Sequence, residues 1–191
     1  MERFRASYSV IKAWSDGRND DALEMYFHKK REETRQQQEG KKWHSEWQAE
    51  TKKTGKLPDV FKMEDTRPNP QLQTELRIET DIPDWMSLRG VIDLYDPATG
   101  TIYDYKTGVS SSGDYAESHQ IPLYAWLLAA TNHLVGSKSF YMHYNQYTKE
   151  SDIALVYITD KRISESVEWF VTQAADMKNH LDKQPTWLRA E

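Results

Sequence analysis

The feature that constrains the fold of this chain most strongly lies between residues 71 and 107, where the hydrophobic period changes from that of a helix to the period of two that is typical of strands. In QLQTELRIET (residues 71–80), Leu72, Leu76 and Ile78 alternate with polar and charged residues, as in a strand with one buried face. Two strand-like segments follow at about residues 88–96 and 101–107, separated by the turn sequence PATG. Short connections favour antiparallel neighbours, so this region predicts a three-stranded meander.

Helical patterns lie on both sides of the meander. The remaining predicted elements are helices at residues 7–15, 19–54, 114–135 and 163–181 and strands at 139–147 and 153–159. A break is expected at Gly40, because glycine inside a helix costs about 1 kcal/mol relative to alanine. The order predicts one α/β domain over 1–191: a mixed β-sheet flanked by helices (71–191), with an N-terminal helical part (1–70).

Composition narrows the functional classes. The 191 residues include no cysteine, which excludes disulfides and cysteine-ligated clusters. No apolar run approaches the roughly 18 residues of a membrane span, and the first residues lack a signal-peptide pattern, so a cytoplasmic protein without membrane contact is expected. The net charge is −5, but residues 29–62 hold ten Lys and Arg against six Asp and Glu. That stretch is either a solvated helix face of mixed charge or a footprint for phosphates.

The turn PATG sets a register for the hairpin on either side of it. If Asp96 faces Thr101, then Asp93 and Asp104 oppose each other directly, with Cβ atoms about 4.5–5.5 Å apart. Lys106 lies two residues beyond Asp104, so it points to the same sheet face. The hairpin therefore predicts two carboxylates and an ammonium group in close proximity.

Directly opposed carboxylates destabilise a sheet unless they share a proton or bind a cation. Oxygen ligands of this kind suit Mg²⁺ or Mn²⁺. Lys106 beside them fits a reaction in which negative charge grows on an oxygen, as in phosphodiester hydrolysis. The alternative is a surface hairpin in which Lys106 only pairs with Asp93 or Asp104, because a D-x-K tripeptide is common by chance.

The flanking motifs favour the chemical interpretation. Four motifs follow in order: Gly40-x-x-x-His44, Gly90-x-x-Asp93, Asp104-Tyr105-Lys106-Thr107-Gly108 and Gln120-x-x-x-Tyr124. This combination resembles the RecB-like branch of the PD-(D/E)XK nucleases, over about residues 7–160. The chain departs from many of these enzymes in lacking the four cysteines of an iron–sulfur cluster. Pro122 also falls inside the helix of the last motif, where a kinked first turn is expected.

The resemblance implies a restriction-endonuclease-like fold and a divalent cation, Mg²⁺ or Mn²⁺, as the cofactor. The implied metal ligands are Asp93, Asp104, the backbone carbonyl of Tyr105 and His44. An imidazole ligand shifts the preference toward Mn²⁺. His44 as an ordinary polar helix residue is the alternative.

The resemblance also implies roles around the metal. Asp93, Asp104 and Lys106 would be catalytic, with Gln120 positioning the site or the DNA strand. Tyr124 lies one helical turn further on and would contact the substrate, or would simply pack in the core. Lys41 and Lys42 belong to the basic stretch and are the expected contacts to DNA phosphates.

Four further side chains are expected near the same place. Glu75 and Glu79 share a strand face, and one of them is expected to line the cleft. Trp43 and Trp47 are one helical turn apart. They either pack in the core, which is the commoner arrangement, or stack bases of a single strand for about 1–3 kcal/mol each.

The predicted function is metal-dependent hydrolysis of DNA, as an exonuclease on duplex ends or single strands in recombination, repair or phage DNA processing. The sequence contains no G-x-x-x-x-G-K-[ST] phosphate loop, so unwinding is expected from a partner helicase or recombination protein. A structure-specific endonuclease, a non-cleaving DNA-binding module and a non-nuclease metal-binding hydrolase are the alternatives. Cleavage polarity and oligomeric state stay open.

Overall fold

Helices cover both faces of a six-stranded mixed sheet in the computed structural model, which describes residues 3–27, 33–63, 68–82 and 85–183. The strands are β1 (Phe4–Ser7), β2 (Gln73–Ile82), β3 (Met86–Asp96), β4 (Thr101–Thr107), β5 (Lys138–Asn145) and β6 (Glu150–Tyr157). The helices are α1 (Tyr8–Ser15), α2 (Asn19–Tyr26), α3 (Arg35–Thr54), α4 (Gly113–Ala116), α5 (Gln120–Ala130) and α6 (Asp160–Lys183), with the 3-10 turn η1 (Asp59–Phe61). The predicted mixed α/β fold class is confirmed. The basic residues Lys29, Lys30 and Arg31 lie outside the described ranges.

The sheet runs in the order β1-β3-β4-β5-β6, and β2 also pairs with β3. The predicted meander β2-β3-β4 is antiparallel throughout. The helical crossover through α5 makes β5 parallel to β4, and a hairpin then makes β6 antiparallel to β5. The short N-terminal strand β1, which the sequence pattern did not predict, lies parallel to β3.

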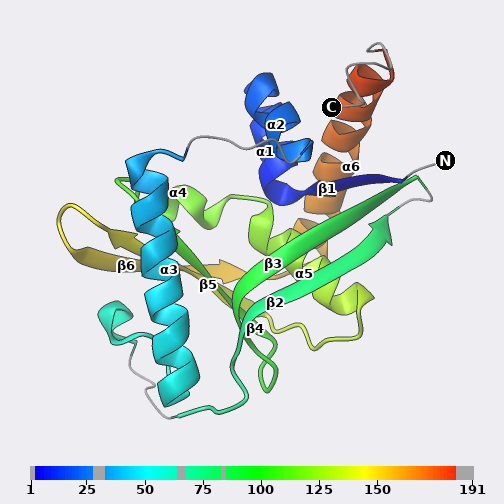
Figure 1. The fold of residues 1–191 in the computed structure, drawn as a ribbon. Helices are drawn as coiled ribbons and strands as arrows, with labels where there is room; N and C mark the ends of the chain where they lie inside the picture. Colours follow the sequence, from blue (N-terminus) through cyan, green and yellow to red (C-terminus); the bar gives the residue numbers. More distant parts are fainter. Residues whose placement is uncertain (1–2, 28–32, 64–67, 83–84, 184–191) are drawn as a thin grey trace.

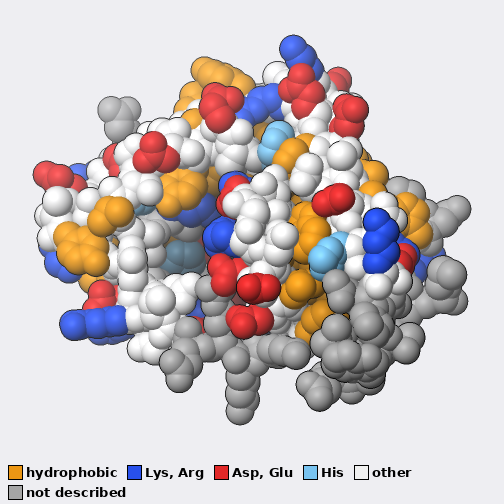
Figure 2. Space-filling view, turned by 90° about the horizontal axis from the view of Figure 1, so that it is seen from above, with side chains coloured by type: hydrophobic (Ala, Val, Ile, Leu, Met, Phe, Trp, Pro, Cys, Tyr) orange, Lys and Arg blue, Asp and Glu red, His pale blue; other side chains and the backbone are white. Residues whose placement is uncertain are grey.

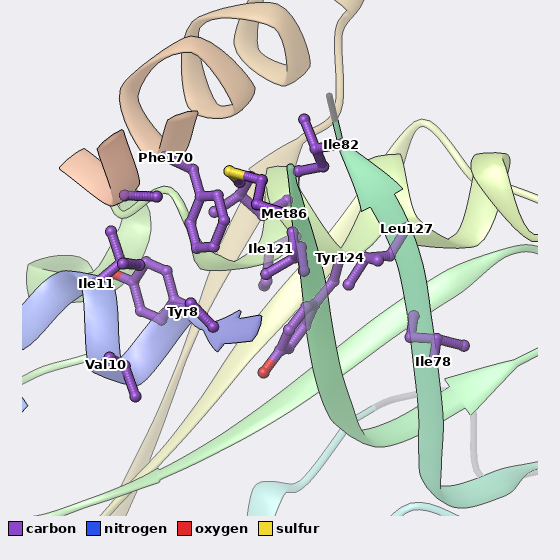
Figure 3. Packing of buried hydrophobic residues seen from close by; sticks show 14 of the residues in the cluster. Tyr8, Val10, Ile11, Ile78, Ile82, Met86, Ile121, Tyr124, Leu127 and Phe170 are labelled. Atoms are coloured by element: carbon purple, nitrogen blue, oxygen red, sulfur yellow. The ribbon is translucent and has the colours of Figure 1, made fainter. Parts of the chain in front are cut away.

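Helix α3 lies on one face of this sheet and α1, α5 and α6 lie on the other (Figure 1), and each face has its own hydrophobic core. The larger core fills the space between the sheet and α1, α5 and α6. Its side chains converge from all of these elements, as Figure 3 shows for Ile11 on α1, Met86 on β3, Ile121 on α5 and Phe170 on α6. The smaller core, with Trp47, Phe61 and Tyr105, lies under α3 and η1. Helix α3 therefore forms a separate wall on its own face of the sheet.

One edge of β3 is shared by two strands that do not meet. Strand β1 pairs with Met86–Arg89, and β4 pairs with Leu94–Asp96. The residues between them, 90–93, form no ladder pair with either strand. The sheet consequently forks beside Gly90 and Asp93, at the second of the four sequence motifs.

The same place interrupts the pairing of β2 with β3. On one side of this point, the even-numbered side chains Leu76 and Ile92 pack on the α5 side of the sheet. On the other side of it, the even-numbered side chains Leu72 and Leu94 pack on the α3 side. Between them, Glu75 and Asp93 are opposite each other in the register but form no pair, and Glu75 has a left-handed φ of 54°. This paired irregularity reverses the two faces of both strands at the candidate site.

Two helix predictions are wrong in detail. The single helix expected over 19–54 is two helices, because α2 ends at Tyr26 and α3 begins at Arg35, and α3 then continues through Gly40 without the expected break. The single helix expected at 114–135 is two helices, α4 and α5, and the second ends at Ala130 rather than at Gly136. Pro122 is the third residue of α5, where its missing N–H removes no intrahelical hydrogen bond. Of the described helices, none has the length and apolar character to cross a membrane.

Candidate active site

Alternation along β4 sends Asp104 and Lys106 to the α5 face, because Tyr105 between them is buried in the core under α3. Gln120, the first residue of α5, contacts both of them. Its Oε1 accepts a hydrogen bond of 2.9 Å from Lys106 Nζ, and its Nε2 donates one of 3.0 Å to Asp104 Oδ1. Lys106 also forms an ion pair with Asp104 Oδ2. The carboxylate, the amide and the ammonium group thus form a closed triangle.

Burial determines the protonation behaviour of this triangle. The Asp104 side chain is only 2% exposed, and desolvation raises its pKa to about 6, with the charge of Asp93 adding to the effect and Lys106 opposing it. For Lys106, burial acts to lower the pKa, but the attraction of Asp104 and Asp93 outweighs it, so the pKa is raised. The lysine is therefore a cation at neutral pH and a source of positive charge, not a neutral base.

Gly90 and Tyr124 link the second and fourth motifs. A Cβ atom at Gly90 would lie 2.7 Å from Cε1 of Tyr124, so only glycine allows α5 to lie this close to β3. Gln120 Nε2 in turn donates a hydrogen bond of 3.1 Å to the Tyr124 hydroxyl. Tyr124 is 6% exposed and belongs to the larger core, so its position agrees with the packing alternative, while its hydroxyl orients Gln120.

Asp93 occupies the fork between β3 and β4. The predicted register holds for the three pairs from Asp96↔Thr101 to Leu94↔Tyr103, and the ladder then ends. The expected direct opposition of Asp93 and Asp104 is therefore wrong. Asp93 instead uses Oδ2 to accept a hydrogen bond of 2.9 Å from the backbone N–H of Tyr105. This bond holds the Asp93 carboxylate at the position where the strands separate.

His44 approaches Asp93 from α3. Its Nδ1 is 3.5 Å from Asp93 Oδ1, and the imidazole is partly exposed. Gly40, one turn earlier, allows this approach, because a Cβ atom there would lie 2.6 Å from Oγ1 of Thr107. The glycine of the first motif thus allows α3 to lie against the end of β4.

A cleft of about 860 Å³ lies between α3 and the strands beside the fork. Its sheet wall contains Glu75, Asp93 and Thr107. Its helix wall is an α3 stripe at helical spacing, which consists of Gln37, Lys41, His44, Gln48 and Lys52, with four further residues of the helix (Gln36, Gly40, Ser45 and Ala49) beside it. Asp104, Lys106 and Gln120 do not line this cleft. The site therefore has an open side under α3 and a closed side under α5.

The structure separates the remaining predicted residues. Lys41 lines the cleft, whereas Lys42 does not and lies 3.8 Å from Glu46 on the exposed surface of α3. Of the two glutamates, Glu75 lines the cleft, and Glu79 accepts a hydrogen bond from Ser87 away from it. Trp47 is buried, with Trp43 stacked against it at 6.0 Å between ring centroids, as expected for core packing.

Part of the basic stretch is neutralised by its own acids. Three pairs occur on or beside α3: Arg35 with Glu39, Lys41 with Glu33, and Lys42 with Glu46. Acidic and basic side chains are also interspersed on the face drawn in Figure 2, without a broad area of one sign. The observed charges agree with a solvated helix face that bears a few individual cations toward the cleft.

The donor set fits a hard divalent cation in its chemistry. Asp93 and His44 line the cleft beside the fork, and Asp104 lies on the α5 side, where its buried Oδ2 meets no donor other than the Lys106 ammonium among the described residues. Within the same residues, no three His, Asp or Glu side chains already form a compact ligand cluster. A cation at this site would therefore compete with Lys106 for Asp104.

Sequence reasoning missed the aromatic residues that enclose Lys106. Tyr115 and Tyr141 both place a ring 5.6 Å from its Nζ. Tyr141 also contacts the Ser118 hydroxyl through its own hydroxyl group. The ladder pair Asp104↔Tyr141 is the signal that could have identified Tyr141, but it depends on the parallel pairing of β4 with β5. No local pattern in the sequence marks Tyr115.

Solved structures share this fold at low sequence identity. A putative exonuclease from Eubacterium rectale has a TM-score of 0.60 at 14% identity, covering 93% of this chain and 82% of that one. An alkaline exonuclease from Laribacter hongkongensis has a TM-score of 0.53 at 12% identity, covering 93% and 90%. A phage-related exonuclease from Haemophilus somnus 129PT has a TM-score of 0.51 at 11% identity, covering 88% and 82%.

Among curated proteins, none matches the chain. The sequence model of the PD-(D/E)XK nuclease superfamily, however, matches residues 2–188. That match spans nearly the whole chain and includes all four motifs and both sides of the site. The chain belongs to the PD-(D/E)XK nuclease superfamily.

Proposed function

We propose that this protein is a divalent-cation-dependent deoxyribonuclease that hydrolyses phosphodiester bonds at DNA ends. Nucleases of its superfamily generally use divalent metals. The observation that carries the proposal is the closed triangle of Asp104, Lys106 and Gln120 beside the Asp93 carboxylate. A protein that only bound DNA would gain nothing from a buried carboxylate and a fixed ammonium group at the fork.

Mg²⁺ or Mn²⁺ is the proposed cofactor, and four groups would hold it: Asp93, Asp104, His44 and the backbone carbonyl of Tyr105. When bound, such an ion lowers the pKa of a coordinated water and neutralises charge on the scissile phosphate. Asp93 is preorganised for this role by the N–H of Tyr105, which fixes one of its oxygens. His44 shares the cleft with Asp93, so the open side is the expected route of entry.

Lys106 supplies the second part of the proposed mechanism. Its ammonium group is a fixed positive charge in a partly dehydrated place, where it stabilises negative charge that develops on a phosphate oxygen or on the attacking water. Gln120 keeps this group in place through its Oε1 while its Nε2 holds Asp104. Gln120 thus sets the distance between the two charged groups without carrying a charge.

The α3 stripe is the proposed track for the DNA backbone. From Gln37 to Lys52 it extends about 22 Å at 1.5 Å per residue, with His44 near its middle. Lysine and glutamine side chains are common phosphate contacts that position a strand without reading its sequence. Lys41 and Lys52 would hold phosphates on the two sides of His44, and Lys42 is withdrawn from the proposed contacts because it faces away from the cleft.

Exonuclease action is the preferred mode, because the structural neighbours are described as exonucleases. A helicase or recombination protein is a proposed partner, since the sequence has no phosphate loop for an unwinding motor. Recombination, repair and phage DNA processing are the processes that would use such an enzyme.

The test is incubation with 5′- or 3′-labelled single-stranded and duplex DNA in Mn²⁺, Mg²⁺ or EDTA. The wild-type protein should degrade DNA from an end with either cation and not with EDTA. Asp104→Ala should be inactive, and Lys42→Ala, on the exposed surface of α3, should match the wild type. Internal cuts at a branch or flap would instead indicate a structure-specific endonuclease. DNA binding without cleavage would overturn the proposal, and so would activity that persists in Asp104→Ala.

A further inference from the structure

The Lys106 ammonium group is enclosed by two tyrosine rings as well as by Asp104 and Gln120. The ring centroids of Tyr115 and Tyr141 are each 5.6 Å from Nζ, within the range of a cation–π contact. The two rings also lie beside each other, with centroids 5.8 Å apart. Lysine is a flexible side chain with several rotatable bonds, so rings on two sides restrict where its charged end can go.

The two tyrosines differ in how they are held. Tyr141 is fully buried in β5, and its hydroxyl is fixed by Ser118 and by the backbone N–H of Ile121 at 3.4 Å. Tyr115 is half-buried and belongs to α4, a single turn between β4 and α5. Tyr141 is therefore part of the permanent core, whereas Tyr115 is the side of the enclosure that local structure must hold in place.

That local structure is braced from β6 and β5. Asp152 on β6 accepts a hydrogen bond of 2.6 Å from the backbone N–H of Ser112, directly before α4. The same carboxylate contacts Nδ1 of His143 at 2.7 Å, and His143 is the ladder partner of Lys106. The buried imidazole of His143 lies 6.3 Å from the Tyr115 ring, between ring centroids, and supports it from the sheet side.

The other end of the turn is braced as well. The carbonyl of Tyr115 accepts a hydrogen bond of 2.9 Å from the N–H of Ser118, and the carbonyl of Ala116 accepts one from the Arg162 side chain on α6. Side chains of two other elements, β6 and α6, thus bond to the backbone at the two ends of this four-residue turn, in addition to its local bond to Ser118. These bonds hold α4, and with it the Tyr115 ring, over Lys106.

We propose that Tyr115 is a positioning residue that keeps the Lys106 ammonium group at the fork through the face of its ring. The inference rests on the proposed function, because it gives Lys106 the catalytic role. Without the ring, the lysine has an open path to solvent on that side and spends part of its time away from Asp104 and Gln120. Because the contact is made by the ring and not by the hydroxyl, phenylalanine should replace tyrosine here.

The first experiment reads the position of Lys106 without any nuclease assay. Wild-type protein, Tyr115→Phe, Tyr115→Leu and Tyr115→Ala are treated briefly with a lysine-acylating reagent, and acylation of Lys106 is measured by peptide mass spectrometry. The Leu and Ala variants should react about fivefold faster or more, and the Phe variant should match the wild type. Tyr147→Ala, at an exposed tyrosine in the β5–β6 turn, is the matched control and should leave Lys106 unchanged.

The second experiment measures Mn²⁺-dependent cleavage of labelled DNA by the same variants. Tyr115→Leu and Tyr115→Ala should lower kcat about tenfold with little change in KM, and Tyr115→Phe should restore it. Circular dichroism melting identifies any variant that fails to fold, and Leu preserves apolar volume if Ala does not fold. Equal acylation of Lys106 in folded Leu or Ala variants and the wild type would overturn the inference. If Lys106 is acylated faster in the Leu and Ala variants but the wild-type protein cleaves no DNA, the positioning role is supported and the proposed function is refuted.

Discussion

The two faces of the sheet meet at the candidate site but are built in opposite ways. Under α5, Asp104 is buried, Lys106 and Gln120 are half-buried, and the three side chains contact one another. Under α3, Asp93 and His44 border an open cleft, and their 3.5 Å approach is longer than a normal hydrogen bond. One face holds its groups in a single arrangement, and the other leaves room for a ligand.

Under the proposed function, this difference gives the two faces separate tasks. A preorganised charge needs a fixed, dehydrated place, because its effect on a reacting group is largest there. A cation and a DNA strand must enter and leave, which requires accessible ligands and space. The fork at Asp93 joins the two tasks, since its carboxylate faces His44 with one oxygen and binds the N–H of Tyr105 on β4 with the other.

The largest expected effect comes from removing the charge on the closed face. Lys106→Ala should lower the single-turnover rate of DNA cleavage about 10²- to 10⁴-fold, because no other cation lies against Asp104 among the described residues. DNA affinity should change little, as Lys106 does not line the cleft. A rate within tenfold of the wild type would place the chemistry on the open face alone.

A smaller loss is expected when the closed face keeps its charges but loses the amide between them. Gln120→Leu leaves Asp104 Oδ1 and Lys106 without their shared partner, and the cleavage rate should fall about 10- to 100-fold. Gln38→Leu, on an exposed part of α3, is the control and should be neutral. Equal rates for the two variants would show that Gln120 only fills space.

The pH dependence of cation binding tests whether the two faces share one ligand. Asp104 is protonated below its raised pKa of about 6, so protons compete with Mn²⁺ there. The Mn²⁺ association constant should fall about tenfold for each pH unit below 6. Calorimetry on the His44→Gln variant removes the imidazole from the comparison. A constant affinity between pH 5 and 7 would mean that Asp104 is not a ligand.

The smallest effect is expected on the open face, far from the chemistry. Lys52→Ala should weaken DNA binding about threefold and reduce the slope of log affinity against log salt concentration by about one. The reason is that Lys52 lines the cleft and forms no ion pair among the described residues. Lys42→Ala is the control, since that ammonium points out of the cleft toward Glu46. Equal losses for both lysines would remove the α3 stripe as the DNA track.

The sequence predicted the closed face better than the open one. The PATG turn and strand alternation correctly placed Asp104 and Lys106 on one face, since both rules depend on neighbours along the chain. The reversal of the two faces beside the fork could not be predicted. The irregularity at Glu75 and Asp93 affects both strands equally, so β2 and β3 pair in the same register on either side of it. Nor could local rules predict that α3 remains intact at Gly40, because its close approach to Thr107 there is a tertiary contact.

The same limit explains the errors around α4 and β1. Residues 114–135 have a continuous helical pattern, and the division into α4 and α5 is held by bonds from distant residues such as Asp152 and Arg162. β1 has only four residues, too few for a period-two pattern to be recognised, and its pairing with β3 is tertiary. Lys41 and Lys42 are adjacent in sequence, and only the orientation of α3 separates them.

The most direct test of this account is a calorimetric titration of Mn²⁺ into the wild-type protein and into Asp104→Asn at neutral pH. A bound cation that reaches both faces needs Asp93 from the open side and Asp104 from the closed side. The wild type should bind Mn²⁺ with an affinity at least about tenfold higher than that of a folded Asp104→Asn variant. Equal affinities, or no binding by the wild type, would contradict a site that joins the two faces.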